Sequence, residues 1–202
     1  MAKLYFKTGC MNSGKSTRLL QAAHQYESLG MRVLCFKPSV DTREDEFVIK
    51  SRLGIKREAL AIYAEDNLFT EMKEYIKYVS KFEKIDIEKM IIMIDEAQFL
   101  TEEQIDQLQD TVYELNINVL AYGLKTDFRG KLFPASKRLI EIADSIHEEK
   151  SICKCGRAAK QNARVVNGKI VTEGEIIQVG GNESYIALCN KCFRNKNIKI
   201  EN

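Results

Sequence analysis

The segment GCMNSGKS places two glycines, a lysine and a serine at the spacing G-x-x-x-x-G-K-[ST]. Glycines let backbone N–H groups turn inward around phosphate oxygens, and a helix beginning at this point adds the field of its N-terminus. Lys15 is then placed to reach the β- and γ-phosphates, and the Ser16 hydroxyl to bind Mg²⁺. The pattern predicts a nucleoside triphosphate site built from Gly9, Cys10, Met11, Asn12, Ser13, Gly14, Lys15 and Ser16.

Two adjacent carboxylates, Asp95 and Glu96, follow the apolar run MIIMI. In phosphate-binding folds of this kind, an acidic residue that ends a buried strand holds the magnesium, which is the role expected for Asp95. Successive side chains on a strand point to opposite faces, so Glu96 is available for another task. It would polarise a water in an ATPase or accept the proton of an attacking hydroxyl in a kinase. The pair alone does not decide between hydrolysis and transfer, and a capping or solvated role is the structural alternative for each residue.

Four of the six cysteines form two pairs, CKC and CNKC, more than thirty residues apart. Two such pairs would form a tetrahedral site of four thiolates, which suits Zn²⁺. Such a site leaves no coordination position open for a substrate, so we expect the metal to be structural. The expected ligands are Cys153, Cys155, Cys189 and Cys192.

The remaining cysteines and the histidines are expected to be structural. Cys10 and Cys35 lie in strand contexts and are expected to be small buried hydrophobes. His24 and His147 lie in stretches that look like helices or helix ends, and are expected to be surface or packed residues.

Strands must alternate with helices to position these groups. Apolar runs predict strands at 3–9, 32–37, 89–97 and 117–124, and helical periodicity predicts helices at 14–30, 67–84, 135–146 and from Thr101, where Gln104 completes a capping box. Residues 39–60 are charged and aperiodic, and predict mostly loop with a structured piece near 48–52. The alternation indicates a parallel α/β sheet with right-handed crossovers.

Beyond residue 148 the helical periods stop, and short strands with an NGK hairpin signal at 167–169 follow. The expected fold is a P-loop (RecA-like) parallel sheet flanked by helices, with a small C-terminal zinc-binding β-rich domain. We expect domains at 1–148 and 149–193 and a tail at 194–202.

Composition limits the function classes. The chain has 202 residues, 45% hydrophobic and 30% charged, and its net charge is +2 from 31 basic and 29 acidic residues. There is no basic stripe with interleaved aromatics, so nucleic acid is not an expected partner. The first residues are too polar for a signal peptide, and no apolar run approaches the roughly 20 residues of a membrane span. We expect a cytoplasmic protein that does not bind a membrane.

Several motifs occur together: the P-loop, DEAQF at 95–99, GLKTDFRGKLFP at 123–134 and VGGNESYIALCNKC at 179–192. In this combination the chain resembles the type II thymidine kinases, the family of cellular bacterial and vertebrate cytosolic enzymes, from about residue 3 to 193. The resemblance implies transfer of the γ-phosphate of ATP to the 5′-hydroxyl of thymidine, giving dTMP, with Glu96 as the general base. It also implies a homotetramer and feedback inhibition by dTTP.

The resemblance further implies a lasso-like loop at 123–134 that closes over the nucleoside. The implied thymidine contacts are Met11, Phe99, Leu124, Phe128, Phe133, Ile176, Gln178 and Tyr185. Gln98 would help hold either the nucleotide or Glu96. Asn162 falls where many members carry a threonine near the thymine methyl group. Ligand roles for Arg129 and for Arg52 remain open.

Two alternatives belong to other classes. An ATP-driven nucleic-acid binder with a zinc ribbon would use Glu96 to activate water, but it should carry a strongly basic face. A nucleotide-binding interaction module without chemistry would leave Glu96 unexplained.

Overall fold

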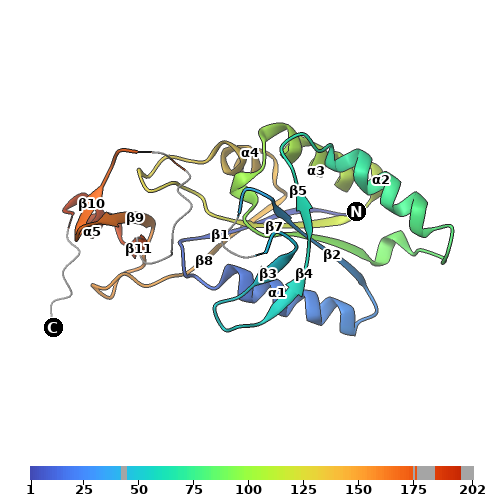
Figure 1. Cartoon of the computed structure of the whole chain (residues 1–202), viewed down its shortest axis with the longest axis horizontal. Helices are drawn as coiled ribbons and strands as arrows, with labels where there is room; N and C mark the ends of the chain where they lie inside the picture. Colours follow the sequence, from blue (N-terminus) through green and yellow to red (C-terminus); the bar gives the residue numbers. More distant parts are fainter. Residues whose placement is uncertain (42–44, 175, 177–184, 197–202) are drawn as a thin grey trace.

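A computed structural model describes residues 1–41, 45–174, 176 and 185–196, so the expected contact Gln178 lies outside the described residues. Its centre is a parallel sheet of six strands in the order β5-β2-β6-β7-β1-β8 (Figure 1). The strands are β1 (Leu4–Gly9), β2 (Arg32–Pro38), β5 (Leu60–Ile62), β6 (Met90–Ile94), β7 (Asn118–Gly123) and β8 (Ser145–Glu149). The expected parallel α/β fold is confirmed.

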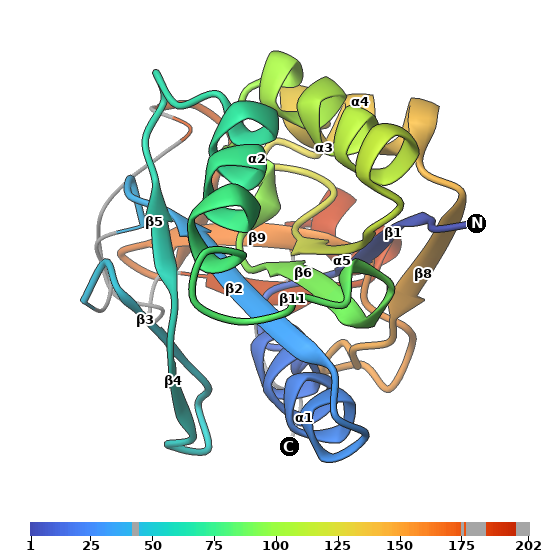
Figure 2. The same cartoon turned by 90° about the vertical axis from the view of Figure 1, so that its right-hand side faces the viewer.

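Helices cover both faces of this sheet. Figure 2 shows α1 (Lys15–Ser28) on one side, and α2 (Leu68–Val79), α3 (Glu102–Leu115) and α4 (Pro134–Ile142) on the other. Each face has its own buried apolar cluster, one around α1 and a larger one beneath the other three helices. Every residue of β6 is buried, which explains its continuous apolar run. No helix of the described chain is long and apolar enough to cross a bilayer.

The capping box that was expected at α3 is confirmed. The Thr101 hydroxyl accepts a hydrogen bond from the Gln104 backbone N–H at 3.0 Å, and the Gln104 side chain accepts one from the Thr101 N–H at 3.1 Å. The preceding turn is the short 3₁₀ helix η2 (Ala97–Phe99), and another 3₁₀ turn, η1 (Ile87–Lys89), precedes β6.

The predicted helix at 135–146 is wrong at its C-terminal end. The helix stops at Ile142, and Ala143 is extended. The Asp144 carboxylate then accepts a hydrogen bond from the Leu4 N–H of β1 at 2.7 Å, which starts the edge strand β8 beside it. His147 therefore lies on a strand and not on a helix end. The deciding contact joins residues far apart in sequence, so local periodicity could not reveal it.

For residues 39–60, the structured piece expected near 48–52 is confirmed, but it extends further along the chain than expected. β3 (Val48–Lys50), near the predicted structured piece, pairs with β4 (Lys56–Glu58) in a hairpin, and β5 begins at Leu60. Each of these strands is only three residues long and β4 is wholly charged, so they leave only a weak alternation in the sequence.

The C-terminal part forms a second, antiparallel sheet in the order β10-β9-β11 at one end of the molecule (Figure 1). It contains β9 (Gln161–Val166), β10 (Lys169–Val171), β11 (Tyr185–Leu188) and the short helix α5 (Asn190–Arg194). The predicted hairpin is confirmed, because Asn167 and Gly168 both have positive φ between β9 and β10. We call the described residues 151–174, 176 and 185–196 the cysteine module.

Candidate functional site

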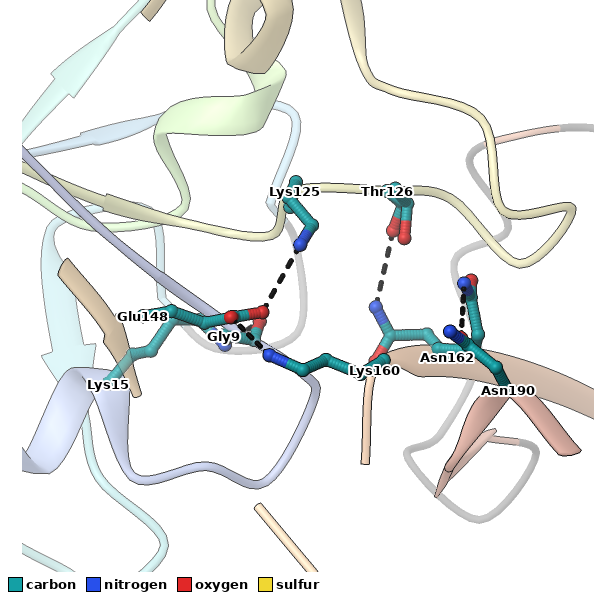
Figure 3. Close-up of polar contacts among 9 residues, drawn as sticks. Gly9, Lys15, Lys125, Thr126, Glu148, Lys160, Asn162 and Asn190 are labelled. Carbon is teal, nitrogen blue, oxygen red and sulfur yellow. Dashed lines mark hydrogen bonds and ion pairs between the residues drawn. The ribbon is translucent and has the colours of Figure 1, made fainter. Parts of the chain in front are cut away.

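The P-loop connects β1 to α1 in a conformation that only certain residues adopt. Asn12 and Gly14 have φ of 65° and 85°, in the left-handed region that glycine and asparagine tolerate best. The Lys15 side chain is 7% exposed, and its ammonium donates to the carbonyls of Gly9 at 3.2 Å and Cys10 at 2.9 Å. Figure 3 shows Lys15 and Gly9 near the start of α1. The positive charge is thus held at the loop, at the start of α1.

Asp95 follows β6 on the same edge of the sheet, with β7 between its strand and the P-loop strand. Burial, and then the neighbouring Glu96 charge, raise the pKa of Asp95 to about 7, although the Ser16 hydroxyl and Lys15 act in the opposite direction. Its Oδ1 atom is buried and accepts no hydrogen bond from the described residues. A buried, unsatisfied carboxylate oxygen beside a serine hydroxyl fits a divalent cation with oxygen ligands, as expected for Mg²⁺.

Glu96 lies at the turn between β6 and η2 with φ 52° and ψ 38°, a left-handed conformation. The Gln98 side-chain amide donates to the Glu96 carboxylate, and its oxygen accepts a hydrogen bond from the Leu124 N–H at 2.8 Å. Gly123 allows this approach, because a Cβ there would lie 2.8 Å from the Gln98 side-chain oxygen. Gln98 therefore ties Glu96 to the beginning of the 123–134 loop, and its role as an ATP or Mg²⁺ ligand stays a prediction.

The 123–134 loop, which we call the lasso loop, presents the expected aromatic residues. It closes through hydrogen bonds from the Asp127 N–H to the Lys131 carbonyl at 2.8 Å and from the Phe133 N–H to the Lys125 carbonyl at 3.3 Å. Phe133 contacts Phe99 edge to face, with ring centroids 6.0 Å apart. The side chains of Leu124, Phe128 and Phe133 are buried. The structure thus brings Phe99 and Phe133 together, three residues after Glu96 and at the end of the lasso loop, whereas Phe128 packs against Arg164.

The two uncertain arginines differ in their surroundings. Arg129 forms an ion pair with the buried Asp127 at 2.6 Å, and the Asp127 carboxylate also accepts hydrogen bonds from the backbone N–H groups of Arg129 and Lys131. Arg129 therefore belongs to the turn of the lasso loop. Arg52 is exposed in the turn between β3 and β4.

The four predicted metal ligands are brought together. The Sγ atoms of Cys153, Cys155, Cys189 and Cys192 all lie within 4.8 Å of one another. A tetrahedral Zn²⁺ with Zn–S bonds of about 2.3 Å separates its sulfurs by about 3.8 Å, so the cluster fits that ion. Gly156 makes the tight turn with φ 81°. The Cys192 backbone N–H points at the Cys189 sulfur and lowers the pKa of Cys189 to about 6, which favours the thiolate that a metal needs.

The other two cysteines lie outside this cluster. Cys10 and Cys35 are buried, and burial raises the pKa of both thiols, that of Cys35 to about 11. The expectation that they are small hydrophobic residues is confirmed. Cys10 packs in the apolar cluster of the cysteine module, so the P-loop and the module share a small core.

Asn162, at the position where many family members carry a threonine, makes two hydrogen bonds that the sequence did not predict. Its side-chain oxygen accepts a hydrogen bond from the Met11 N–H at 2.7 Å. Its amide donates to the Thr126 carbonyl at 3.2 Å (Figure 3). The side chain is 3% exposed. It links the cysteine module to the P-loop and to the lasso loop at once, and no local signal in the sequence indicates this.

Glu148, at the end of β8, is a second link that sequence reasoning missed. Its carboxylate pairs with Lys125 of the lasso loop at 3.1 Å and with Lys160, which precedes β9 (Figure 3). Burial by itself raises the pKa of Glu148, but hydrogen bonds from Lys160 and Lys125 outweigh it and lower the pKa. Three segments therefore meet at one carboxylate beside the P-loop.

Comparison with known proteins gives a consistent family. The thymidine kinase family model matches residues 2–193. A thymidine kinase of Legionella pneumophila is 45% identical over 99% of this chain and 93% of its own length. A thymidine kinase of Mannheimia succiniciproducens is 44% identical over the full length of both chains. Among solved structures, genome packaging NTPase B204 of Sulfolobus turreted icosahedral virus 2 has a TM-score of 0.45 and 15% identity, covering 73% of this chain and 74% of that one.

The relatives cover this chain almost from end to end, and the family model includes the P-loop, the Asp95–Glu96 pair, the lasso loop and the four thiols. The chain belongs to the thymidine kinase family.

Proposed function

We propose that this protein transfers the γ-phosphate of ATP to the 5′-hydroxyl of thymidine, giving dTMP and ADP. The observation that carries the proposal, together with the family, is the arrangement around Glu96. Its carboxylate is held by Gln98, which in turn binds the Leu124 N–H of the lasso loop. A single carboxylate is thus tied, through one amide, to the loop that carries the buried Phe128 and Phe133.

The phosphate side of the reaction is assigned to the P-loop. Residues 9–16 would surround the phosphates with N–H groups, and the Lys15 ammonium would exchange its two backbone carbonyls for phosphate oxygens. Mg²⁺, held by Ser16 and Asp95, would supply charge neutralisation at the β- and γ-phosphates. The low-dielectric position of Asp95 strengthens its attraction for a cation.

The transfer itself is assigned to Glu96. The 5′-hydroxyl oxygen forms a bond to the γ-phosphorus while the bond from that phosphorus to the ADP oxygen breaks, and Glu96 takes the hydroxyl proton. Because the transition state is loose, positioning of the hydroxyl matters more than basicity, and the proton moves late. The left-handed backbone at Glu96 fixes the direction of its side chain.

The nucleoside side is assigned to apolar contacts. Leu124, Phe128 and Phe133, with Met11 and Phe99, would enclose the thymine ring and exclude water, which suits a flat base. Ile176, Gln178 and Tyr185 would complete the site, largely through main-chain atoms.

Further parts of the proposal rest on the family. The four thiols would hold a structural Zn²⁺, and the protein would be a cytoplasmic homotetramer inhibited by dTTP. The proposed domain division is 1–148 for nucleotide and 149–193 for zinc and the nucleoside side, with a tail at 194–202.

The test is transfer of γ-³²P from ATP to thymidine, with the other nucleosides in parallel. Labelled dTMP is expected from the wild type, and the Glu96→Gln variant should lose about 10²- to 10⁴-fold in rate while it still binds ATP. Glu103→Gln, at an exposed position of α3, is the matched control and should retain activity. Release of phosphate to water, with no labelled nucleotide from any nucleoside, would overturn the proposal and favour an ATPase.

A further inference from the structure

Arg164 is a buried charged residue that the reaction above does not use. It lies two residues after Asn162 on β9, so both side chains point from the same face of the strand. Its side chain is 3% exposed. A guanidinium that is removed from water to this extent must obtain its stabilisation from specific neighbours.

Those neighbours are three of the residues expected to contact thymidine. The Arg164 Cζ atom lies 3.8 Å from the centroid of the Phe128 ring. Its Nε donates to the Tyr185 hydroxyl at 2.8 Å, and one terminal nitrogen donates to the Ile176 carbonyl at 3.3 Å. The three contacts come from three separate segments: the lasso loop, the chain after β10, and β11.

The geometry uses properties that are particular to arginine. A planar guanidinium can stack on an aromatic ring while its edge donates several hydrogen bonds in fixed directions. A lysine ammonium has neither the flat face nor the fork. Gly174 lies close to the same guanidinium, and its φ of 119° is a backbone conformation that favours glycine.

We propose that Arg164 is a positioning residue for the nucleoside: it holds the Phe128 ring, the Tyr185 hydroxyl and the Ile176 carbonyl together as one wall of the thymine pocket. This inference rests on the proposed function. Arg164 acts through these three residues and does not meet the reacting atoms, so it should govern affinity for thymidine and leave the phosphate side unchanged. Asn162, its neighbour on the same face, instead contacts the P-loop directly.

The test compares Arg164→Lys, Tyr185→Phe and the double variant with the wild type, all loaded with zinc. Arg157→Lys, an exposed arginine of the same module, is the matched control. For Arg164→Lys, thymidine KM, and thymidine Kd measured by calorimetry without ATP, should rise about tenfold. For Tyr185→Phe they should rise about threefold. ATP KM and zinc content should stay at the wild-type values. The double variant should lose less thymidine affinity than the product of the two single effects, because both changes break the same contact between Arg164 and Tyr185.

Two outcomes would overturn the proposal. Thymidine affinity within twofold of the wild type in Arg164→Lys would mean that the wall forms without the guanidinium. Parallel rises in thymidine and ATP KM, or loss of zinc, would mean that Arg164 supports the module as a whole. A wild-type protein that neither binds nor phosphorylates thymidine would instead overturn the proposed function, so the wild-type arm separates the two failures.

Discussion

The α/β domain and the cysteine module hold their functional residues in different ways. In the α/β domain, apolar clusters on both faces of a six-stranded sheet fix the ends of β1 and β6, where the P-loop and Asp95 lie. The cysteine module has one small cluster, and three of its four clustered cysteines, with Cys10 of the P-loop, make up half of the buried residues in it. Below a certain size, a core of this kind needs a metal to hold it together.

This difference in how the two regions are held together should affect the binding of the two proposed substrates differently. Groups that would meet ATP lie on elements with a core of their own, whereas much of the thymidine wall depends on a module held by four thiols and on a few polar links. Those links are the Asn162 hydrogen bonds, the Glu148 ion pairs and the Arg164 contacts. Perturbing the module should therefore affect the nucleoside before the nucleotide.

Removal of zinc is the strongest test of this separation. After chelation at neutral pH, or in a Cys155→Ser variant, thymidine phosphorylation should fall by at least about 100-fold because the thymidine wall loses its support. Binding of a non-hydrolysable ATP analogue should weaken by only a few fold. Cys35→Ala, a thiol buried in β2 outside the cluster, is the control. Equal loss of both substrates would show that the two regions form one cooperative unit.

Gly123→Ala tests the α/β side of the comparison. The new Cβ would meet the Gln98 side-chain oxygen at 2.8 Å and the Gln98 backbone nitrogen at 3.1 Å, so Gln98 must move and Glu96 loses its support. We expect kcat to fall about 10- to 100-fold, with zinc content unchanged. In combination with Gln98→Leu the effects should not multiply, since both remove one support. A multiplicative loss would assign the two residues to separate roles.

Asn162→Ala should cut one link between the regions. The Met11 N–H and the Thr126 carbonyl would both lose their partner, and buried groups without partners cost about 1–3 kcal/mol. We expect kcat/KM for both substrates to fall about tenfold, because the P-loop and the lasso loop are held by the same amide. Lys169→Ala, exposed on the β9–β10 hairpin, should behave as wild type. Asn162→Thr should recover part of the ATP effect through its hydroxyl.

Glu148→Gln should have the smallest effect, because the carboxylate and its lysines are partly exposed. The net pKa of Glu148 is lowered, so the stability it contributes is present above its unfolded pKa and is lost as pH falls through the folded value. Thermal denaturation at pH 7 should show a decrease of about 1–2 °C, which 1 M salt reduces. A difference that is insensitive to salt would show that the links are not electrostatic.

Sequence reasoning predicted the parts whose chemistry is local. The P-loop spacing, the four thiols and the Thr101 capping box depend on residues that are near one another in the chain, and each was found as expected. β8 was missed because the helical pattern is ended by a hydrogen bond between Asp144 and Leu4 of the neighbouring strand β1, which is far away in the sequence.

The residues that join the two regions could not be predicted for the same reason. Asn162 and Arg164 are unremarkable in a strand sequence, and their importance follows only from which loops lie over β9. The resemblance to a family supplied positions for the expected thymidine contacts, but it did not indicate which side chains hold those residues in place.

Glu96 carries a consequence for the evolution of this chain. Among the described residues, five that are not glycine have positive φ. Three of these five are asparagines, which tolerate the conformation well, but Glu96 is a glutamate. The conformation costs on the order of 1 kcal/mol, which a glycine would recover while deleting the carboxylate. Selection for stability alone would therefore drive this position away from glutamate, so its persistence in a lineage would report that phosphoryl transfer is still being used.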